Sequence, residues 1–146
     1  MNIRLAKAED KQVVYELFKQ LKGEKSFDET RFDDNFAEII KNKDRYIILL
    51  DVEGKTVGMT VINLVVALGK TEARVDEVIV DQQTRGKGAG TILMQGVEKY
   101  CWEQGCDYIE FTSRADRAAA NHLYQKLGYK LRETNVYQKN SKTLDN

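Results

Sequence analysis

The chain has no proline, one histidine and two cysteines among its 146 residues. Without proline, repeats or a low-complexity tract, nothing marks a hinge or a linker, so we expect one domain over residues 1–140. Residues 141–146 are expected to form a disordered tail. Cys101 and Cys106 do not have the spacing of a zinc site, and a single histidine excludes a histidine-rich one. We therefore predict no metal.

A net charge and a long apolar run are missing as well. The 23 lysines and arginines equal the 23 aspartates and glutamates, so no net field attracts nucleic acid or an anionic membrane. No apolar run approaches the roughly 20 residues that cross a bilayer. The first residues, MNIRLAKAED, lack the apolar stretch of a signal peptide. We expect a cytoplasmic protein with reduced thiols and with no membrane or nucleic-acid partner.

The sequence does contain a regular succession of helix-like and strand-like segments. Apolar residues spaced by three and four predict helices over residues 8–22, 26–42, 88–104 and 116–127, the last with Asp116 as its N-cap. Strands are predicted over residues 2–6, 45–52, 55–68, 71–80, 106–114 and 129–139, with a tight turn at Glu53-Gly54. The order β-α-α-β-β-β-α-β-α-β indicates an α/β or α+β fold with a mixed, mostly antiparallel sheet.

Three glycines stand between a predicted strand and a predicted helix, in the stretch RGKGAG of residues 85–90. The first N–H groups of a helix have no partner within it and lie at the positive end of its dipole. Glycines keep these groups accessible, and Arg85 and Lys87 add positive charge. The combination is typical of a loop that binds a diphosphate, although a glycine-rich turn that only connects two elements is the other interpretation.

Two common phosphate-binding patterns do not fit this loop. The P-loop requires Gly-Lys-Ser/Thr after four intervening residues, and that sequence is absent. GKGAGT is not the dinucleotide fingerprint G-x-G-x-x-G, and the chain is too short for a long parallel sheet.

The stretch RGKGAG resembles the signature Arg/Gln-x-x-Gly-x-Gly/Ala of the GNAT acetyltransferases, which follows a central strand in that family. A second GNAT signature is a helix with Asn or His followed by Tyr, ending in Leu-Gly-Tyr/Phe. This chain has Asn121, Tyr124 and Leu127-Gly128-Tyr129 in such a helix. With the order of elements, the resemblance extends to about Lys139. In layout the chain is similar to small bacterial members that acetylate free amines.

The resemblance implies an N-acetyltransferase that uses acetyl-CoA as cosubstrate and a small primary amine as acceptor. Backbone N–H groups of the loop would bind the pyrophosphate, and the open edge of the preceding strand would pair with the pantetheine arm. The N–H of Ile79 would stabilise the oxyanion, and Asn121 would bind the pantetheine arm or a water. The implied coenzyme contacts are Val78, Ile79, Val80, Arg85, Gly86, Lys87, Gly88, Ala89, Gly90, Thr91, Asn121 and Tyr124.

Two residues are candidates for acid–base chemistry. Glu77 lies among β-branched residues, which can raise the pKa of a carboxylate and suit a base that deprotonates the amine. Its alternative role is to face solvent or to pair with Arg74. Alternation along the strand places the neighbouring Asp76 on the other face unless a bulge resets the register. Tyr124 matches the GNAT acid that protonates the leaving thiolate; from its helix alone it would be a core aromatic. His122 is expected to be exposed and non-catalytic.

For the acceptor pocket, the sequence leaves two roles open for each candidate residue. In this family the pocket is built by the loop between the first two helices and by the last strands. In this chain the loop region has Glu24, Asp28, Glu29, Asp33 and Asp34, which form an acidic rim or simply cap a helix. Phe27, Phe32 and Tyr46 would line the pocket or pack in the core. No base stands near either cysteine, so we expect direct transfer in a ternary complex. A non-catalytic acetyl-CoA-binding module and a partner-dependent protein N-acetyltransferase stay open, and such folds often form homodimers.

Overall fold

The structure is a computed structural model that describes residues 1–141. These residues form two compact units, Met1–Thr112 and a second unit that begins at Ser113. The predicted tail, residues 141–146, lies outside the described residues except for Ser141. Within residues 1–141, no helix has the length and apolar content to cross a bilayer.

The first unit carries most of the predicted elements, but the strand predicted over residues 106–114 is much shorter, Tyr108–Glu110. They are β1 (Asn2–Leu5), α1 (Lys11–Lys22), α2 (Glu29–Lys41), β2 (Arg45–Val52), β3 (Lys55–Val66), β4 (Thr71–Val80), α3 (Ala89–Glu103) and β5 (Tyr108–Glu110). Single 3-10 turns cover Ala8–Asp10 and Gln82–Thr84; the first was predicted as the start of a helix and the second was not predicted. The second unit contains α4 (Ala118–Lys126).

The five strands form one sheet in the order β1-β2-β3-β4-β5. The first four strands are antiparallel to their neighbours, and β5 is parallel to β4. This mixed, mostly antiparallel sheet with helices confirms the predicted fold class. The turn between β2 and β3 has φ of 52° at Glu53 and 79° at Gly54, as a two-residue turn with two left-handed positions requires.

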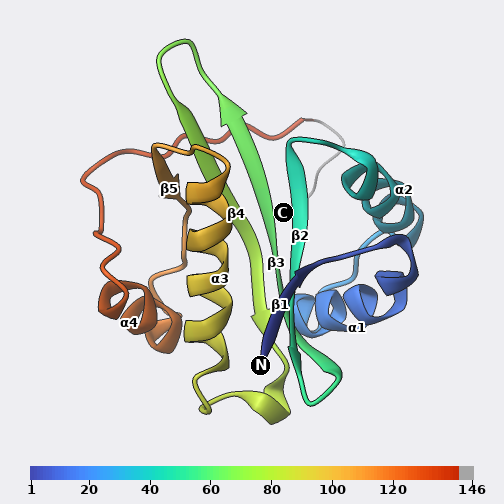
Figure 1. Ribbon diagram of the computed structural model, residues 1–146. Coiled ribbons are helices and arrows are strands. Elements are labelled where there is room, and N and C mark those ends of the chain that lie inside the picture. The colour runs from blue at the N-terminus through green and yellow to red at the C-terminus, as the bar shows by residue number, and fades with distance from the viewer. Residues whose placement is uncertain (142–146) are drawn as a thin grey trace. The chain divides into compact units, whose positions relative to one another are not determined.

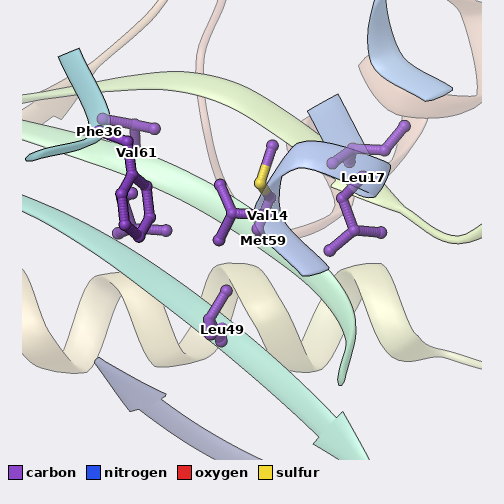
Figure 2. Packing of buried hydrophobic residues seen from close by; sticks show 8 residues of the cluster. Val14, Leu17, Phe36, Leu49, Met59 and Val61 are labelled. Carbon is purple, nitrogen blue, oxygen red and sulfur yellow. The ribbon is translucent and has the colours of Figure 1, made fainter. Parts of the chain in front are cut away.

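The helices of the first unit cover both sides of the sheet, with α1 and α2 on one side and α3 on the other (Figure 1). On the α1–α2 side, the buried cluster contains Val14, Leu17, Phe36, Ile47, Leu49, Met59, Val61 and Ile79. Figure 2 shows six of these side chains converging from two helices and two strands. This face forms the base on which the candidate site is built.

Local sequence signals explain where the second helix begins. The side chain of Asp28 accepts a hydrogen bond from the N–H of Arg31, which satisfies one of the free donors of the first turn. The preceding helix, α1, ends at Gly23 with φ of 62°. The segment between them, with Phe27, is therefore held at both ends.

Two predictions for the second unit were wrong. Residues 129–139 form no strand, because a strand needs a partner and no described strand pairs with this polar segment, whose Leu131 and Tyr137 are exposed. The N-cap of α4 is Arg117 and not Asp116, whose carboxylate lies 2.7 Å from the guanidinium of Arg114.

Candidate active site

The loop between β4 and α3 presents a run of free backbone donors. From Arg85 through Thr91, no backbone N–H donates to another described residue, and the first such bond is from Ile92 to the carbonyl of Gly88 at 3.1 Å. Gly86 and Gly88 have φ of 79° and 80°, which favour glycine. A Cβ at either position would meet no atom within 4 Å, so the space beside these two glycines is open.

The loop is anchored at both ends. Nε of Arg85 donates to the carbonyl of Val80 at 3.0 Å, which ties the loop to the end of β4. Ala89, at the first position of α3, is 2% exposed and fixes the start of the helix in the core. Lys87 is exposed between the two glycines. An anion bound here would meet fixed donors, a positive helix end and a mobile cation.

β4 has an open edge next to this loop. β5 pairs only with Glu72, Ala73 and Arg74, so residues 75–80 pair with β3 on one side and with no described strand on the other. Open backbone groups of this kind can accept an extended, peptide-like ligand as an added strand. Val78, Ile79 and Val80 all lie on this segment, as the sequence predicted.

The N–H of Ile79, which was expected to stabilise the oxyanion, does not face the open edge of β4. The N–H of Asp81 donates to the carbonyl of Val57 at 2.7 Å, and hydrogen-bonded pairs alternate along an antiparallel ladder. The N–H of Ile79, two residues earlier and opposite Met59, therefore faces β3. The carbonyl of Val80 accepts from Arg85 and so faces the open edge, and its N–H faces the same way. Val80 is thus the better donor.

A β-bulge interrupts β4 at Glu77. Ile79 pairs with Met59 and Asp76 pairs with Val61, so Glu77 and Val78 together oppose Thr60. Glu77 has φ of 55°, which is uncommon for a residue other than glycine and is often found at functional sites. Simple alternation would place Asp76 and Glu77 on opposite faces. The bulge places both on the α1–α2 side, where Asp76 accepts a 2.9 Å hydrogen bond from Asn63.

Thr60 supports the bulge from within. It is fully buried, and its hydroxyl donates to the carbonyl of Asp76 at 2.9 Å. This bond satisfies a backbone acceptor beside the bulge, where the regular ladder is interrupted. Sequence reasoning missed Thr60, although a threonine in an apolar strand was a weak signal for it.

The carboxylate of Glu77 is accessible and has no hydrogen bond or ion pair with another described residue. The alternative pairing with Arg74 does not occur, since that guanidinium lies 3.4 Å from Glu72. Glu77 is exposed as a residue, but the protein atoms around its carboxylate partly desolvate it and so raise its pKa. The nearby Asp76 raises the pKa further, and Lys22 opposes the shift. A carboxylate in this state can accept a proton from a bound ligand.

Glu77 borders a cavity of about 690 Å³, a volume that includes solvent at its mouth. The lining residues come from α1, α2, the loop between them and three strands: Val14, Phe18, Phe27, Asp28, Arg31, Phe32, Asn35, Phe36, Ile39, Ile47, Met59, Val61 and Glu77.

The cavity differs from the predicted acceptor pocket in two respects. Of the five acidic residues predicted to form a rim, only Asp28 lines it, while Glu29 bonds Tyr15 and Asp33 pairs with Lys11. Phe27 and Phe32 line the cavity, which was one of the two roles that the sequence allowed them. Tyr46 does not; its ring packs against Tyr100, with centroids 5.0 Å apart. Arg31, Asn35 and Phe18 were missed, although helical spacing from Phe32 and Phe36 could have found the first two.

In the second unit, Asn121 and Tyr124 both lie on α4. The side-chain amide of Asn121 donates to the carbonyl of Arg114 at 2.9 Å, so its donor holds the loop before the helix. Tyr124 packs edge-on to Tyr129, with centroids 6.3 Å apart. Burial raises the pKa of Tyr124, with an opposing effect of Arg117, so its phenol is protonated at neutral pH. His122 is exposed.

The cysteines are both free and buried. Burial raises the pKa of the Cys101 thiol to about 12, so almost none of it is thiolate at neutral pH. Within residues 1–141, no three histidine, cysteine or acidic side chains gather where a metal ion could bind.

Comparison with known proteins places this geometry in a family. The sequence pattern of the "Acetyltransferase (GNAT) family" matches residues 11–129. An uncharacterized N-acetyltransferase of Methanocaldococcus jannaschii is 28% identical over 101 residues, which are 67% of this chain and 45% of that protein. The chain thus spans less than half the length of this relative.

Solved structures agree on the fold. A transcriptional regulator from Bacillus halodurans has a TM-score of 0.84 at 22% identity, over 94% of this chain and 98% of the other. The aminoglycoside N-acetyltransferase AAC(6')-Iy, solved in complex with CoA, has a TM-score of 0.83 at 15% identity, over 95% of this chain and 93% of the other. At these identities the likeness shows the fold alone. The family match, however, includes both the glycine loop and the helix with Asn121 and Tyr124, and the chain belongs to the acetyltransferase (GNAT) family.

Proposed function

We propose that this protein is an N-acetyltransferase that transfers an acetyl group from acetyl-CoA to a primary amine, by direct attack in a ternary complex. The observation that carries the proposal is the run of free N–H groups from Arg85 to Thr91 at the start of α3, beside the open edge of β4. The donors fit a diphosphate, and the open edge fits a peptide-like arm. Acetyl-CoA combines both groups and supplies the thioester.

Glu77 serves as the base in this proposal. An alkylamine has a pKa of about 10 and is protonated at neutral pH, so it must lose a proton before it attacks a thioester. The Glu77 carboxylate is free to take that proton, directly or through water, and its raised pKa brings it closer to the working pH. Asp76, engaged by Asn63, is less available.

Two further groups act on the thioester. The N–H of Val80, which faces the open edge, polarises the carbonyl and stabilises the oxyanion. Tyr124, protonated at neutral pH, stays the predicted acid for the leaving thiolate. A covalent acyl-enzyme on Cys101 would need a thiolate, and its high pKa opposes one.

The test is a screen of small primary amines with acetyl-CoA, read by thiol release, with the purified chain alone. We expect turnover without a partner protein and intersecting initial-velocity lines. Glu77→Gln should lower kcat/KM, whereas Glu72→Gln, on the same strand beside Arg74, should not. CoA binding with no turnover of any amine would favour a non-catalytic module. Turnover that requires an added polypeptide would favour a protein N-acetyltransferase.

A further inference from the structure

We propose that the acceptor is an elongated primary amine, with its amino group at Glu77, an apolar body of ring size in the middle and a carboxylate at Arg31 and Asn35. The inference rests on the proposed function, because it names the acceptor of that reaction. It depends on how the cavity beside Glu77 distributes its apolar and polar side chains.

The middle of the cavity is apolar. Ile47, Met59 and Val61 of the sheet form its floor. Val14 of α1 and Phe36 of α2 also line it, and each of these five residues is at most 6% exposed. Its wall is aromatic: the rings of Phe18, Phe27 and Phe32 have centroids 4.9 to 6.3 Å apart. A hydroxyl or ammonium group placed here would lose water without gaining a partner, so sugars and polyamines are disfavoured. A ring or a branched chain gains from the same contact.

The polar lining residues lie at opposite ends of this apolar floor. Glu77 belongs to β4, the floor continues through Met59 and Val61 on β3, and Ile47 belongs to β2. Arg31 and Asn35 belong to α2, which packs on β2. Neighbouring strands are about 4.8 Å apart, so the floor from β4 to β2 spans about 10 Å. The ligand therefore needs two polar ends separated by an apolar segment.

The α2 end offers donors for an anion. Arg31 and Asn35 are four residues apart and so share one face of the helix. Neither side chain makes a hydrogen bond or ion pair with another residue in the described range 1–141. Among the lining residues at this end only Asp28 is acidic, and its carboxylate accepts the N–H of Arg31 as the helix cap. A guanidinium can bind a carboxylate by two parallel N–H···O bonds, and the side-chain amide of Asn35 offers a further donor.

The test compares 4-(aminomethyl)benzoate, benzylamine and spermidine as acceptors for the unaltered chain, for Arg31→Gln and for Arg45→Gln, which removes an exposed cation outside the cavity. We expect kcat/KM for 4-(aminomethyl)benzoate to exceed that for benzylamine by about tenfold, as one charge-assisted contact allows. Arg31→Gln should abolish this difference and Arg45→Gln should keep it. Spermidine should be the poorest acceptor.

A preference for spermidine, or a ratio that Arg31→Gln leaves unchanged, would overturn the inference while the proposed function stands. Binding of 4-(aminomethyl)benzoate, measured by calorimetry without acetyl-CoA, tests the inference independently of the proposed function. Binding that is lost in Arg31→Gln supports the inference even if no amine is acetylated, which would refute the proposed function alone. Neither binding nor turnover of this probe would overturn the inference.

Discussion

Replacing Gly88 with alanine should have two effects that can be measured separately: backbone strain, which lowers stability, and damage to the proposed diphosphate site, which lowers CoA affinity. Gly88 has φ of 80°, and a Cβ there meets no atom within 4 Å. Alanine in this left-handed conformation costs about 1–2 kcal/mol. Its methyl group would also project into the open space beside the glycine loop.

Gly54 provides a matched control. It lies in the β2–β3 turn with φ of 79°, and its Cβ would likewise meet nothing within 4 Å. Gly54→Ala and Gly88→Ala should therefore destabilise the chain equally, by about 2–8 °C in melting temperature at the usual 2–4 °C per kcal/mol. Only Gly88→Ala should weaken CoA binding, since a lost hydrogen bond to a charged group is worth about 1.5–3 kcal/mol, or about 10- to 150-fold in Kd.

Calorimetric titration with CoA and scanning calorimetry measure the two effects separately. If Gly88→Ala bound CoA as tightly as Gly54→Ala does, the free donors of the loop would not be the diphosphate site. If both variants lost binding to the same extent, the loss would follow from instability and not from the loop.

Three further predictions concern the base, the thiol and the ion pairs. Because burial, followed by Asp76, raises the pKa of Glu77, kcat/KM should rise with pH through a step above pH 4.5, and Glu77→Gln should remove the step and lower kcat/KM by about 10²- to 10⁴-fold. Cys101→Ala should lower the melting temperature by removing a buried side chain but leave kcat unchanged; a loss of kcat in folded protein would indicate an acyl-enzyme. The hydrogen bond from Arg4 lowers the pKa of Asp10 in the folded state, so its stabilisation is complete above the ordinary value of 3.8 and is lost as the pH falls through the lower folded value. The unfolding free energy of Arg4→Met should therefore decrease less than that of the unaltered chain between pH 5 and pH 2; equal decreases would contradict this coupling.

The parts of the fold that depend on nearby residues were predictable. The stripe Phe32, Phe36, Ile39 and Ile40 predicts α2, and the RGKGAG stretch predicts a glycine-rich loop at a helix start, because neighbours in sequence decide both. Turn chemistry likewise places the β2–β3 hairpin.

Features set by distant pairing were not predictable. The bulge at Glu77 depends on the register between β3 and β4, which Thr60 helps to hold and which no local pattern of β4 encodes. The same register decides that the N–H of Ile79 faces β3. Tyr46 looked like a pocket residue until its strand parity placed it against Tyr100, on the side opposite the cavity.

The unpaired side of β4 has a consequence for the behaviour of the protein in solution. A strand with free backbone groups is a template for any other extended chain, including a second copy of itself. The two charged side chains on this stretch, Asp76 and Glu77, make such contact unfavourable between two like strands. Substitutions that neutralise them would therefore promote aggregation without altering the fold, and a bound ligand that occupies the edge would protect against it.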